Sequence, residues 1–313
     1  MVSSFRTCVL LAVALAPLLL FLRRRTRRSF KLPHKNERIL ILGASSGIGR
    51  TLAHQYAALG VKGVCVVGRR EDKLAEVVAE CDACKGPNTH VFGIAGDIAE
   101  AKDMVKLRTQ LESQWGGIDT LIVAAGVSAL RPIMDIAADA PGAEGIQHVV
   151  DIAALATRGN FVGPLVAAVT FIPLLESSSP RPAILLLNSL ASLIPAPTRA
   201  LYAATKSASL HLYQALAIEH PRIAFSHVLP STVEGDFRAS AIDGGAPREN
   251  DPNKRGLKRD AVARRCRRAI DRSEKNVFQP WAMGPAHMLY WMLPGLVERL
   301  ASAKYNFSAP VTP

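Results

Sequence analysis

Residues 39–49, ILILGASSGIG, contain the clearest indication of the fold. The first four residues form a short, continuous apolar run, which is typical of a buried parallel strand. A turn follows in which Gly43, Gly47 and Gly49 have the spacing G-x-x-x-G-x-G. Apolar residues then recur at helical spacing until Gly60, a residue that commonly ends helices. The order of strand, glycine-rich turn and helix predicts a phosphate-binding unit of an α/β protein.

The glycine-rich turn suits a pyrophosphate for two physical reasons. Glycines let the backbone turn tightly and approach the ligand, and the unpaired N–H groups at the start of the helix favour negative charge. The candidate cofactor contacts in this turn are Gly43, Ser45, Ser46, Gly47, Ile48 and Gly49.

Further short apolar runs, separated by segments with helical periodicity, predict additional strands. The runs cover residues 63–67, 91–94, 120–125, 183–187 and 224–229. Strands that alternate with helices predict an α/β fold with a parallel sheet.

Two arginines, Arg69 and Arg70, directly follow the second predicted strand. An acidic residue here would bind the ribose hydroxyls of NAD, whereas arginine pairs with the additional phosphate of NADP. The sequence therefore favours NADP(H). The alternative is that both arginines are solvent-exposed residues at the start of a helix.

The fifth predicted strand leads to Ser189, and Tyr202 and Lys206 follow with the spacing Y-x-x-x-K. Residues i and i+4 share one helix face, so the Lys206 ammonium can lie beside the Tyr202 phenol and favour the phenolate. This group predicts proton transfer near the carboxyl ends of the strands, where ligands bind in open α/β sheets.

Over roughly residues 38–300, these motifs together resemble the short-chain dehydrogenase/reductase family. The resemblance implies a single doubly wound Rossmann domain with a mostly parallel seven-stranded sheet. It also implies that Tyr202 exchanges a proton with the substrate oxygen, that Ser189 polarises this oxygen, and that Lys206 lowers the Tyr202 pKa and holds the nicotinamide ribose.

The resemblance implies further site residues. Asn160, in the pattern N-x-x-G, would anchor a water in a proton relay from Lys206, although a helix-capping or turn role is the alternative. The remaining expected cofactor contacts are Asp97 and Ile98 at the adenine, Gly126 close to the cofactor, and Val233 and Thr232 at the nicotinamide amide. A helix N-cap is the alternative role for Asp97.

The chain departs from the family pattern at several positions. Val123 and Ala124 stand where the family usually has two asparagines, and Ser231 and Gly235 replace its usual glycine and threonine. These departures motivate an alternative function, a catalytically degenerate NADP(H)-binding scaffold or sensor at a membrane. The intact serine, tyrosine and lysine favour an enzyme.

The N-terminal region, residues 1–35, is predicted to be a membrane anchor with a basic flank, and residues 36–313 the catalytic domain. Residues 8–22 are uninterrupted apolar residues, a little short of the length of a spanning helix, so interfacial insertion is an alternative. Five arginines follow within residues 23–28, which places the body of the protein in the cytosol. We expect a location at the endoplasmic reticulum or a lipid droplet. A cleaved signal peptide fits less well, because the positive charge follows the apolar run.

The net charge of +12 does not indicate a nucleic-acid partner, because no nucleic-acid motif accompanies the arginine clusters at 23–28 and 264–268. Cys81 and Cys84 form a single CxxC with no second ligand pair, so no metal site is expected. They are expected in a polar connection between a helix and a strand.

The substrate region is predicted less directly. Residues 234–259 are polar and rich in glycine and proline, which suits a mobile lid. Aromatic and methionine residues gather in 281–293, as expected for an apolar entrance facing a membrane, for core packing or for a homodimer contact. With the anchor, these features favour a hydrophobic carbonyl or alcohol, such as a lipid, steroid, retinoid or sphingoid ketone.

Overall fold

The computed structural model describes residues 28–246 and 252–308, so the predicted anchor at 8–22 lies outside the described residues. Its strands are β1 Arg38–Leu42, β2 Gly63–Gly68, β3 His90–Ala95, β4 Thr120–Val123, β5 Ala183–Leu187, β6 Ala224–Pro230 and β7 Asn276–Gln279. Its longer helices are α3 Gly47–Leu59, α4 Glu71–Cys84, α5 Ala101–Trp115, α7 Gly142–Thr157, α8 Gly163–Ser178, α9 Ala200–Glu219, α11 Arg259–Arg272, α12 Met283–Met292 and α13 Pro294–Lys304. Its short helical segments are α2 Arg28–Lys31, η1 His34–Asn36, α6 Ile133–Ala137, η2 Arg158–Val162, η3 Leu190–Ser192 and α10 Pro252–Arg255.

The seven strands form one sheet in the order β3-β2-β1-β4-β5-β6-β7, and every neighbouring pair is parallel. The chain builds the sheet outward from β1 on one side and then from β4 on the other. Such a reversal leaves a crevice at the carboxyl ends of the central strands. The doubly wound α/β fold predicted from the sequence is confirmed.

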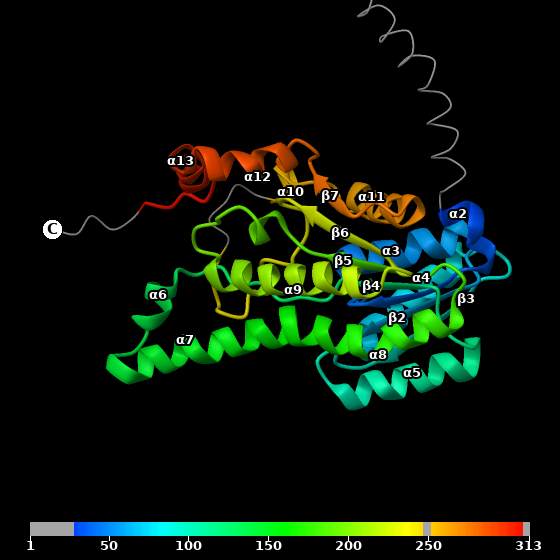
Figure 1. The fold of residues 1–313 in the computed structure, drawn as a ribbon. Helices are drawn as coiled ribbons and strands as arrows, with labels where there is room; N and C mark the ends of the chain where they lie inside the picture. The colour runs from blue at the N-terminus through cyan, green and yellow to red at the C-terminus, as the bar shows by residue number, and fades with distance from the viewer. Residues whose placement is uncertain (1–27, 247–251, 309–313) are drawn as a thin grey trace, which may run out of the picture.

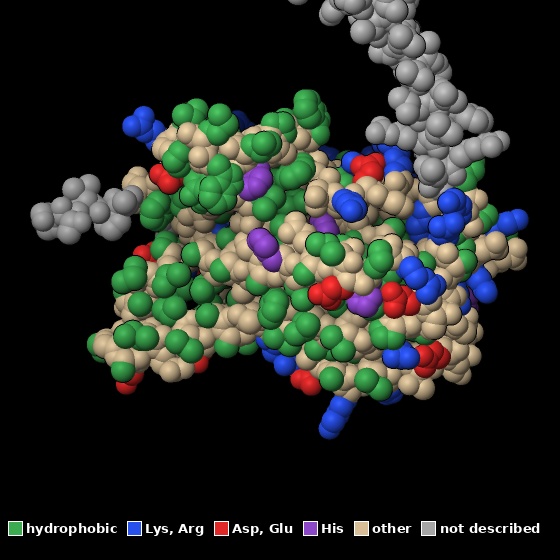
Figure 2. Space-filling model, viewed as in Figure 1, with side chains coloured by type: hydrophobic (Ala, Val, Ile, Leu, Met, Phe, Trp, Pro, Cys, Tyr) green, Lys and Arg blue, Asp and Glu red, His purple; other side chains and the backbone are tan. Residues whose placement is uncertain are grey.

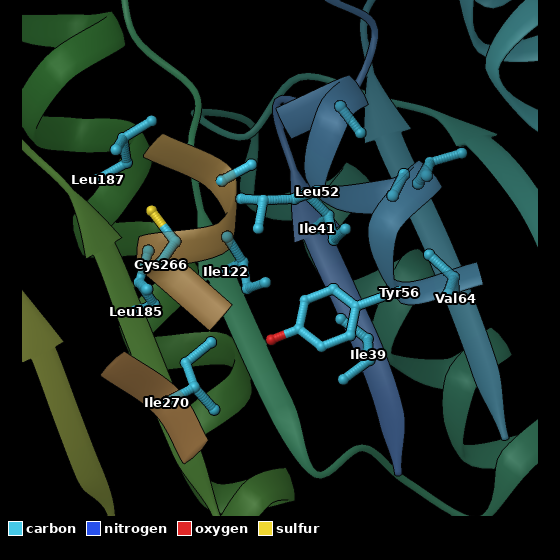
Figure 3. Packing of buried hydrophobic residues seen from close by; sticks show 14 of the residues in the cluster. Ile39, Ile41, Leu52, Tyr56, Val64, Ile122, Leu185, Leu187, Cys266 and Ile270 are labelled. Atoms are coloured by element: carbon cyan, nitrogen blue, oxygen red, sulfur yellow. The ribbon is translucent and has the colours of Figure 1, made fainter. Parts of the chain in front are cut away.

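Helices cover both faces of the sheet, with α3, α4 and α11 on one face and α5, α8 and α9 on the other (Figure 1). Along β1 the side chains alternate, so that Ile39 and Ile41 join one core while Leu40 and Leu42 join the other. Figure 3 shows Ile39 and Ile41 beside Tyr56 of α3. Because β1 is buried on both faces, it reads as a continuous apolar run.

Arg28 has a different environment from the one predicted for the basic flank. It is 3% exposed, forms an ion pair with Glu37, and donates to the Asp119 carbonyl at 3.0 Å and to Thr120 Oγ1 at 2.8 Å. A buried arginine needs such partners, since its charge cannot be lost by deprotonation. The folded domain therefore already includes Arg28, and the assignment of this residue to a lipid-facing flank is wrong.

Two other sequence predictions differ in detail. β4 ends at Val123 rather than Ala125, because the chain turns there toward the crevice. Cys81 and Cys84 lie in the last turn of α4 and not in a connection, and Cys81 is buried in the core. Among the described residues, no group of three or more His, Cys, Asp or Glu could hold a metal ion.

Within residues 28–246 and 252–308, one helical stretch is long and apolar enough to cross a membrane, namely Gly142–Ser178. It runs through α7, η2 and α8, and its buried residues Phe171 and Leu175 pack against the sheet. A core helix of a water-soluble domain has this same composition, so the stretch does not indicate a membrane span.

Candidate active site

The carboxyl ends of the central strands open into a cavity of about 910 Å³. This size falls within the range of about 300–1,000 Å³ that is usual for ligand sites. All of the site residues predicted from the sequence line the cavity except Asn160, which lies behind it. They are Gly43, Ser45, Ser46, Gly47, Ile48, Gly49, Arg69, Arg70, Asp97, Ile98, Gly126, Ser189, Tyr202, Lys206, Thr232 and Val233.

The glycine-rich turn forms a tight cradle at the start of α3. Gly43 has a φ of 90°, and a Cβ on it would lie 2.4 Å from the Ala125 nitrogen. A Cβ on Gly49 would lie 2.1 Å from the Gly43 carbonyl oxygen. Only glycines fit these two positions, and they bring the backbone N–H groups of the helix start to the cavity surface. The cradle therefore fits a pyrophosphate.

Arg69 and Arg70 lie exposed at the rim of this cradle, directly after β2. The Arg70 guanidinium donates to Ser45 Oγ at 3.2 Å, which fixes it against the glycine-rich turn. Both side chains therefore bring positive charge to the rim of the cradle.

Asp97 and Ile98 follow β3 on the same side of the cavity. Asp97 Oδ1 accepts a hydrogen bond from the Ala99 backbone at 2.9 Å, and Asp97 Oδ2 accepts one from Arg158 at 3.1 Å. The Ile98 side chain is held against Gly163, where an added Cβ would come within 2.7 Å of it. These contacts fix the wall of the cavity where an adenine ring would lie.

Ser189, Tyr202 and Lys206 come together on the opposite side. Tyr202 is 5% exposed, and a hydrogen bond with Ser189 favours its phenolate form. Lys206 is 4% exposed, and its ammonium donates to the Leu187 carbonyl at 3.2 Å. A serine from the end of β5 and two residues from α9 thus converge at one point, as a proton-transfer site requires.

The charges around Tyr202 differ from the sequence expectation. Burial raises the pKa of Tyr202, while the Ser189 hydrogen bond and the cations Arg199 and Arg238 lower it. The expectation assigned this lowering to Lys206, whose ammonium instead donates to the backbone of β5.

Asn160 lies in the π-helical turn η2, a type of helix defect that often occurs at functional sites. Its Oδ1 accepts from the Val127 N–H at 2.8 Å, and its Nδ2 donates to the Val127 carbonyl at 3.0 Å and to Thr205 Oγ1 at 3.1 Å. A Cβ on Gly126 would lie 2.9 Å from Asn160 Oδ1 and 3.1 Å from Lys206 Nζ. Gly126 therefore allows the amide and the ammonium to approach each other.

This geometry agrees with the comparisons to known proteins. The short chain dehydrogenase family matches residues 37–244, which is more than half of the chain. The chain belongs to this family.

Curated relatives include an 11-beta-hydroxysteroid dehydrogenase-like 4A from Arabidopsis thaliana, 32% identical over 63% of this chain and 60% of its own length. The chain thus spans about 60% of the length of this relative. An 11-beta-hydroxysteroid dehydrogenase A from Sesamum indicum is 30% identical over 77% of this chain and 68% of its own length. A hydroxysteroid 11-beta-dehydrogenase 1-like protein from Gallus gallus is 26% identical over 99% of this chain and 100% of its own.

Two solved structures confirm the fold. A short chain dehydrogenase/reductase from Burkholderia phymatum in complex with NAD has a TM-score of 0.70 at 19% identity, covering 90% of this chain and 99% of its own. An alcohol dehydrogenase from Thermococcus sibiricus complexed with 5-hydroxy-NADP has a TM-score of 0.62 at 22% identity, covering 77% and 94%. The first of these two structures holds NAD and the second 5-hydroxy-NADP.

Several residues of this short-chain dehydrogenase were not predicted as site residues. Asn188 accepts from the Ser189 N–H at 2.8 Å and donates to the Lys206 carbonyl at 3.0 Å, so it joins β5 to α9. The wall beyond Tyr202 contains Arg199, Arg238 and Tyr305. Asn188 stands directly before Ser189, Arg199 three residues before Tyr202, and Arg238 three residues after Gly235, so these could have been considered, whereas Tyr305 is distant in sequence from every motif.

Burial of Lys206 predicts a pH-dependent effect on stability. Burial lowers the pKa of Lys206 from 10.5 to about 8, so the unfolded chain binds the proton more tightly. Stability then rises with pH between about 8 and 10.5, and at pH 7 the charged form costs about 3 kcal/mol. After about 1 kcal/mol is subtracted for the lost hydrogen bond to Leu187, Lys206→Met should stabilise the cofactor-free protein by about 2 kcal/mol at pH 7.

The measurement is urea unfolding of the full-length protein in detergent at pH 7 and pH 10. The stability difference between Lys206→Met and wild type should shrink or reverse at pH 10. Lys102→Met, at an exposed position on α5, is the control, and its difference from wild type should be the same at both pH values. An equal effect of Lys206→Met at both pH values would show that the ammonium is not desolvated.

Proposed function

We propose that this short-chain dehydrogenase is an NADP(H)-dependent oxidoreductase that transfers a hydride between the nicotinamide and a hydrophobic carbonyl or alcohol. One observation carries the proposal: Ser189, Tyr202 and Lys206 line the same cavity as the glycine cradle. A phosphate site and a proton-transfer site in one cavity are what a nicotinamide-dependent reaction needs.

The residues of the chain would act on the substrate oxygen. The cofactor, when bound, supplies or accepts the hydride at the substrate carbon. In the reducing direction, Tyr202 donates a proton to the carbonyl oxygen, while the Ser189 hydroxyl hydrogen-bonds this oxygen and draws charge onto it. The Ser189 hydrogen bond and the positive charges of Arg199 and Arg238 favour the resulting phenolate. Lys206 would hold the nicotinamide ribose, and Asn160, through Val127 and Thr205, keeps the helix that carries this lysine aligned. A carbonyl, a hydride and a proton give an alcohol.

The preference for NADP(H) rests on Arg69 and Arg70. Two cations at the rim beyond β2 favour a phosphate on the adenine ribose over a free hydroxyl. Arg69→Gln should raise KM for NADPH about 10-fold to 100-fold and change KM for NADH little, because only NADPH loses a charge-assisted hydrogen bond. Initial rates with each cofactor provide the test.

Arg268→Gln is the control for this experiment, since Arg268 is exposed on α11 and away from the cavity. It should leave both KM values unchanged. If Arg69→Gln raised KM for NADPH and NADH equally, Arg69 would not distinguish the cofactors.

The proposed substrate class rests on the relatives and on the surface. Their names refer to hydroxysteroids, which are apolar carbonyl or alcohol compounds. Figure 2 shows hydrophobic side chains gathered over α12 and α13. The exposed members on and beside these helices are Trp281, Met288, Trp291, Met292, Leu293, Leu296 and Leu300.

A large exposed apolar surface of this kind suits contact with a membrane. Lys304 and Tyr305, at the end of α13, line the cavity, so a substrate dissolved in the lipid could enter there.

We further propose that the chain is held at the endoplasmic reticulum or a lipid droplet, with this domain in the cytosol. Protease treatment of sealed microsomes should degrade the domain, and protection of the domain from the protease would contradict this orientation.

We also propose that the chain forms a homodimer through exposed apolar residues of α7, such as Ile146 and Val150.

A further inference from the structure

Arg259, the first residue of α11, lies between the catalytic cavity and a second pocket beside it. The second pocket has a volume of about 470 Å³ and is bordered by α3, α4 and the start of α11, which packs along α3 (Figure 1). Both Arg259 and Gly47 line the two spaces. Because Gly47 is the first residue of α3, Arg259 borders the helix start that forms the glycine cradle.

Backbone pairing holds Arg259 against the loop that follows β6. Leu257 and Val233 form a parallel β-bridge, and the Glu234 N–H donates to the Leu257 carbonyl at 3.0 Å. The Arg259 N–H donates to Glu234 Oε1 at 2.9 Å. Arg259 is therefore fixed beside the loop in which the sequence predicts contacts with the nicotinamide amide.

Gly235, in the same loop, leaves room for the Arg259 side chain. A Cβ on Gly235 would lie 3.5 Å from Arg259 Cδ and 3.6 Å from Arg259 Nε and Cζ. Gly235 also has a φ of 107°, a conformation that L side chains rarely adopt. Where the family usually has a threonine, this chain therefore has a glycine with a guanidinium packed against it.

The acidic side chains that line the second pocket have other cationic partners. The pairs are Glu80 with Arg50 and His54, Glu234 with Lys258, and Asp260 with Arg264. Within residues 28–246 and 252–308, the Arg259 guanidinium forms no hydrogen bond or ion pair, and it acts on Glu234 through its charge. Its N–H donors are therefore available to a ligand in the catalytic cavity.

The position of Arg259 fits the pyrophosphate of the cofactor. Residues 43–49 of the cradle contain no basic side chain, so the cradle itself offers a pyrophosphate N–H groups without a full positive charge. Arg69 follows β2, whereas Arg259 lies beside the loop after β6, and three strands separate β2 from β6. Arg259 therefore approaches the cradle from the side away from the adenine ribose.

A bound anion would also remove an unfavourable interaction of Arg259 with its own helix. Arg259 begins a helix of 14 residues, and the dipole of a helix disfavours a cation at its first turn. A phosphate next to the guanidinium would compensate both positive charges, because arginine N–H groups pair with phosphate oxygens.

We propose that Arg259 binds the pyrophosphate of the nicotinamide cofactor, and that Gly235 admits its guanidinium to this position. The proposal rests on the part of the proposed function that concerns the cofactor. It applies to NADPH and NADH alike, because both contain the pyrophosphate. Arg259 thus differs from Arg69, which would contact only the additional phosphate of NADPH.

The test measures the Kd of the full-length protein in detergent for NADPH and for NADH by fluorescence titration, and the binding of adenosine 2′-phosphate by competition with NADPH. Arg259→Gln should raise both Kd values about 10-fold, and should leave the binding of adenosine 2′-phosphate, which has no pyrophosphate, within about twofold. Arg259→Lys keeps the charge but not the paired N–H groups, so its Kd values should rise only about threefold.

Two matched variants complete the comparison. Arg69→Gln should show the opposite pattern, with weaker binding of NADPH and adenosine 2′-phosphate and little change for NADH. Arg268→Gln, at an exposed position of α11, should change no Kd. Without cofactor, Arg259→Gln should unfold at the wild-type temperature, because its exposed guanidinium forms no bond that the fold would lose.

Three outcomes would overturn the proposal. If Arg259→Gln bound both dinucleotides as wild type does, Arg259 would not contact the cofactor, and the proposed function would still stand. If only the binding of NADPH were weakened, Arg259 would contact the ribose phosphate and not the pyrophosphate. If wild type bound neither dinucleotide, this proposal and the proposed function would both fail.

Discussion

Replacing Tyr202 with phenylalanine is expected to lower kcat for carbonyl reduction by about 10³-fold, within the range that general acid–base catalysis contributes. Phenylalanine keeps the ring that packs near Phe237 and Arg199 and removes only the hydroxyl that donates the proton. The glycine cradle is untouched, so the Kd for NADPH should stay within about threefold of wild type. Single-turnover rates and fluorescence titration of NADPH measure the two quantities.

Tyr213→Phe provides a matched control on the same helix. Tyr213 is fully buried in α9, and its hydroxyl donates to the Pro164 carbonyl at 2.9 Å, away from the cavity. This variant should lose about 1 kcal/mol of stability and keep its kcat. If Tyr202→Phe retained the wild-type rate, another group would donate the proton. If wild type bound NADPH and reduced no carbonyl, the alternative of a binding scaffold would be favoured.

The second large effect is expected at the glycine cradle. Gly49→Ala would place a methyl group 2.1 Å from the Gly43 carbonyl oxygen, which belongs to the backbone of the tight turn between β1 and α3. Because this turn cannot move without disturbing β1 or α3, we expect a loss of about 3 kcal/mol or more in the free energy of unfolding.

Gly47→Ala separates this steric effect from the general effect of replacing a glycine. Gly47 has a φ of 58°, but an added Cβ there meets no atom within 4 Å. This variant should therefore lose only about 1 kcal/mol, the usual cost of a left-handed alanine. Chemical denaturation of the cofactor-free protein compares the two. Equal losses would show that the close packing at Gly49 does not determine stability.

Much of the fold follows from local sequence patterns. Strands β1, β2, β5 and β6 are buried on both faces and therefore read as continuous apolar runs, close to their observed bounds. The pattern predicts no range for β7, because its four residues, Asn-Val-Phe-Gln, combine two polar residues with a single fully buried side chain. An edge strand of this length acquires its structure from its pairing with β6.

The candidate site is predictable to the extent that its geometry is local. Tyr202 and Lys206 are four residues apart on one helix, so their shared face follows from helix geometry alone. Arg199 and Arg238 are 39 positions apart and line the same cavity because α9 packs beside β6, which no local pattern encodes. The burial of Arg28 likewise depends on a long-range contact, because its guanidinium binds Thr120 of β4 as well as the nearby Glu37.

Transfer of deuterium from NADPH labelled at C4 of the nicotinamide to an apolar ketone tests the central claim most directly. The wild-type protein should give an alcohol that carries one deuterium at the former carbonyl carbon, detected by mass spectrometry, and Tyr202→Phe should give almost none in the same time. Tight binding of NADPH by wild type, without label in any alcohol across a panel of apolar and anionic ketones, would contradict it.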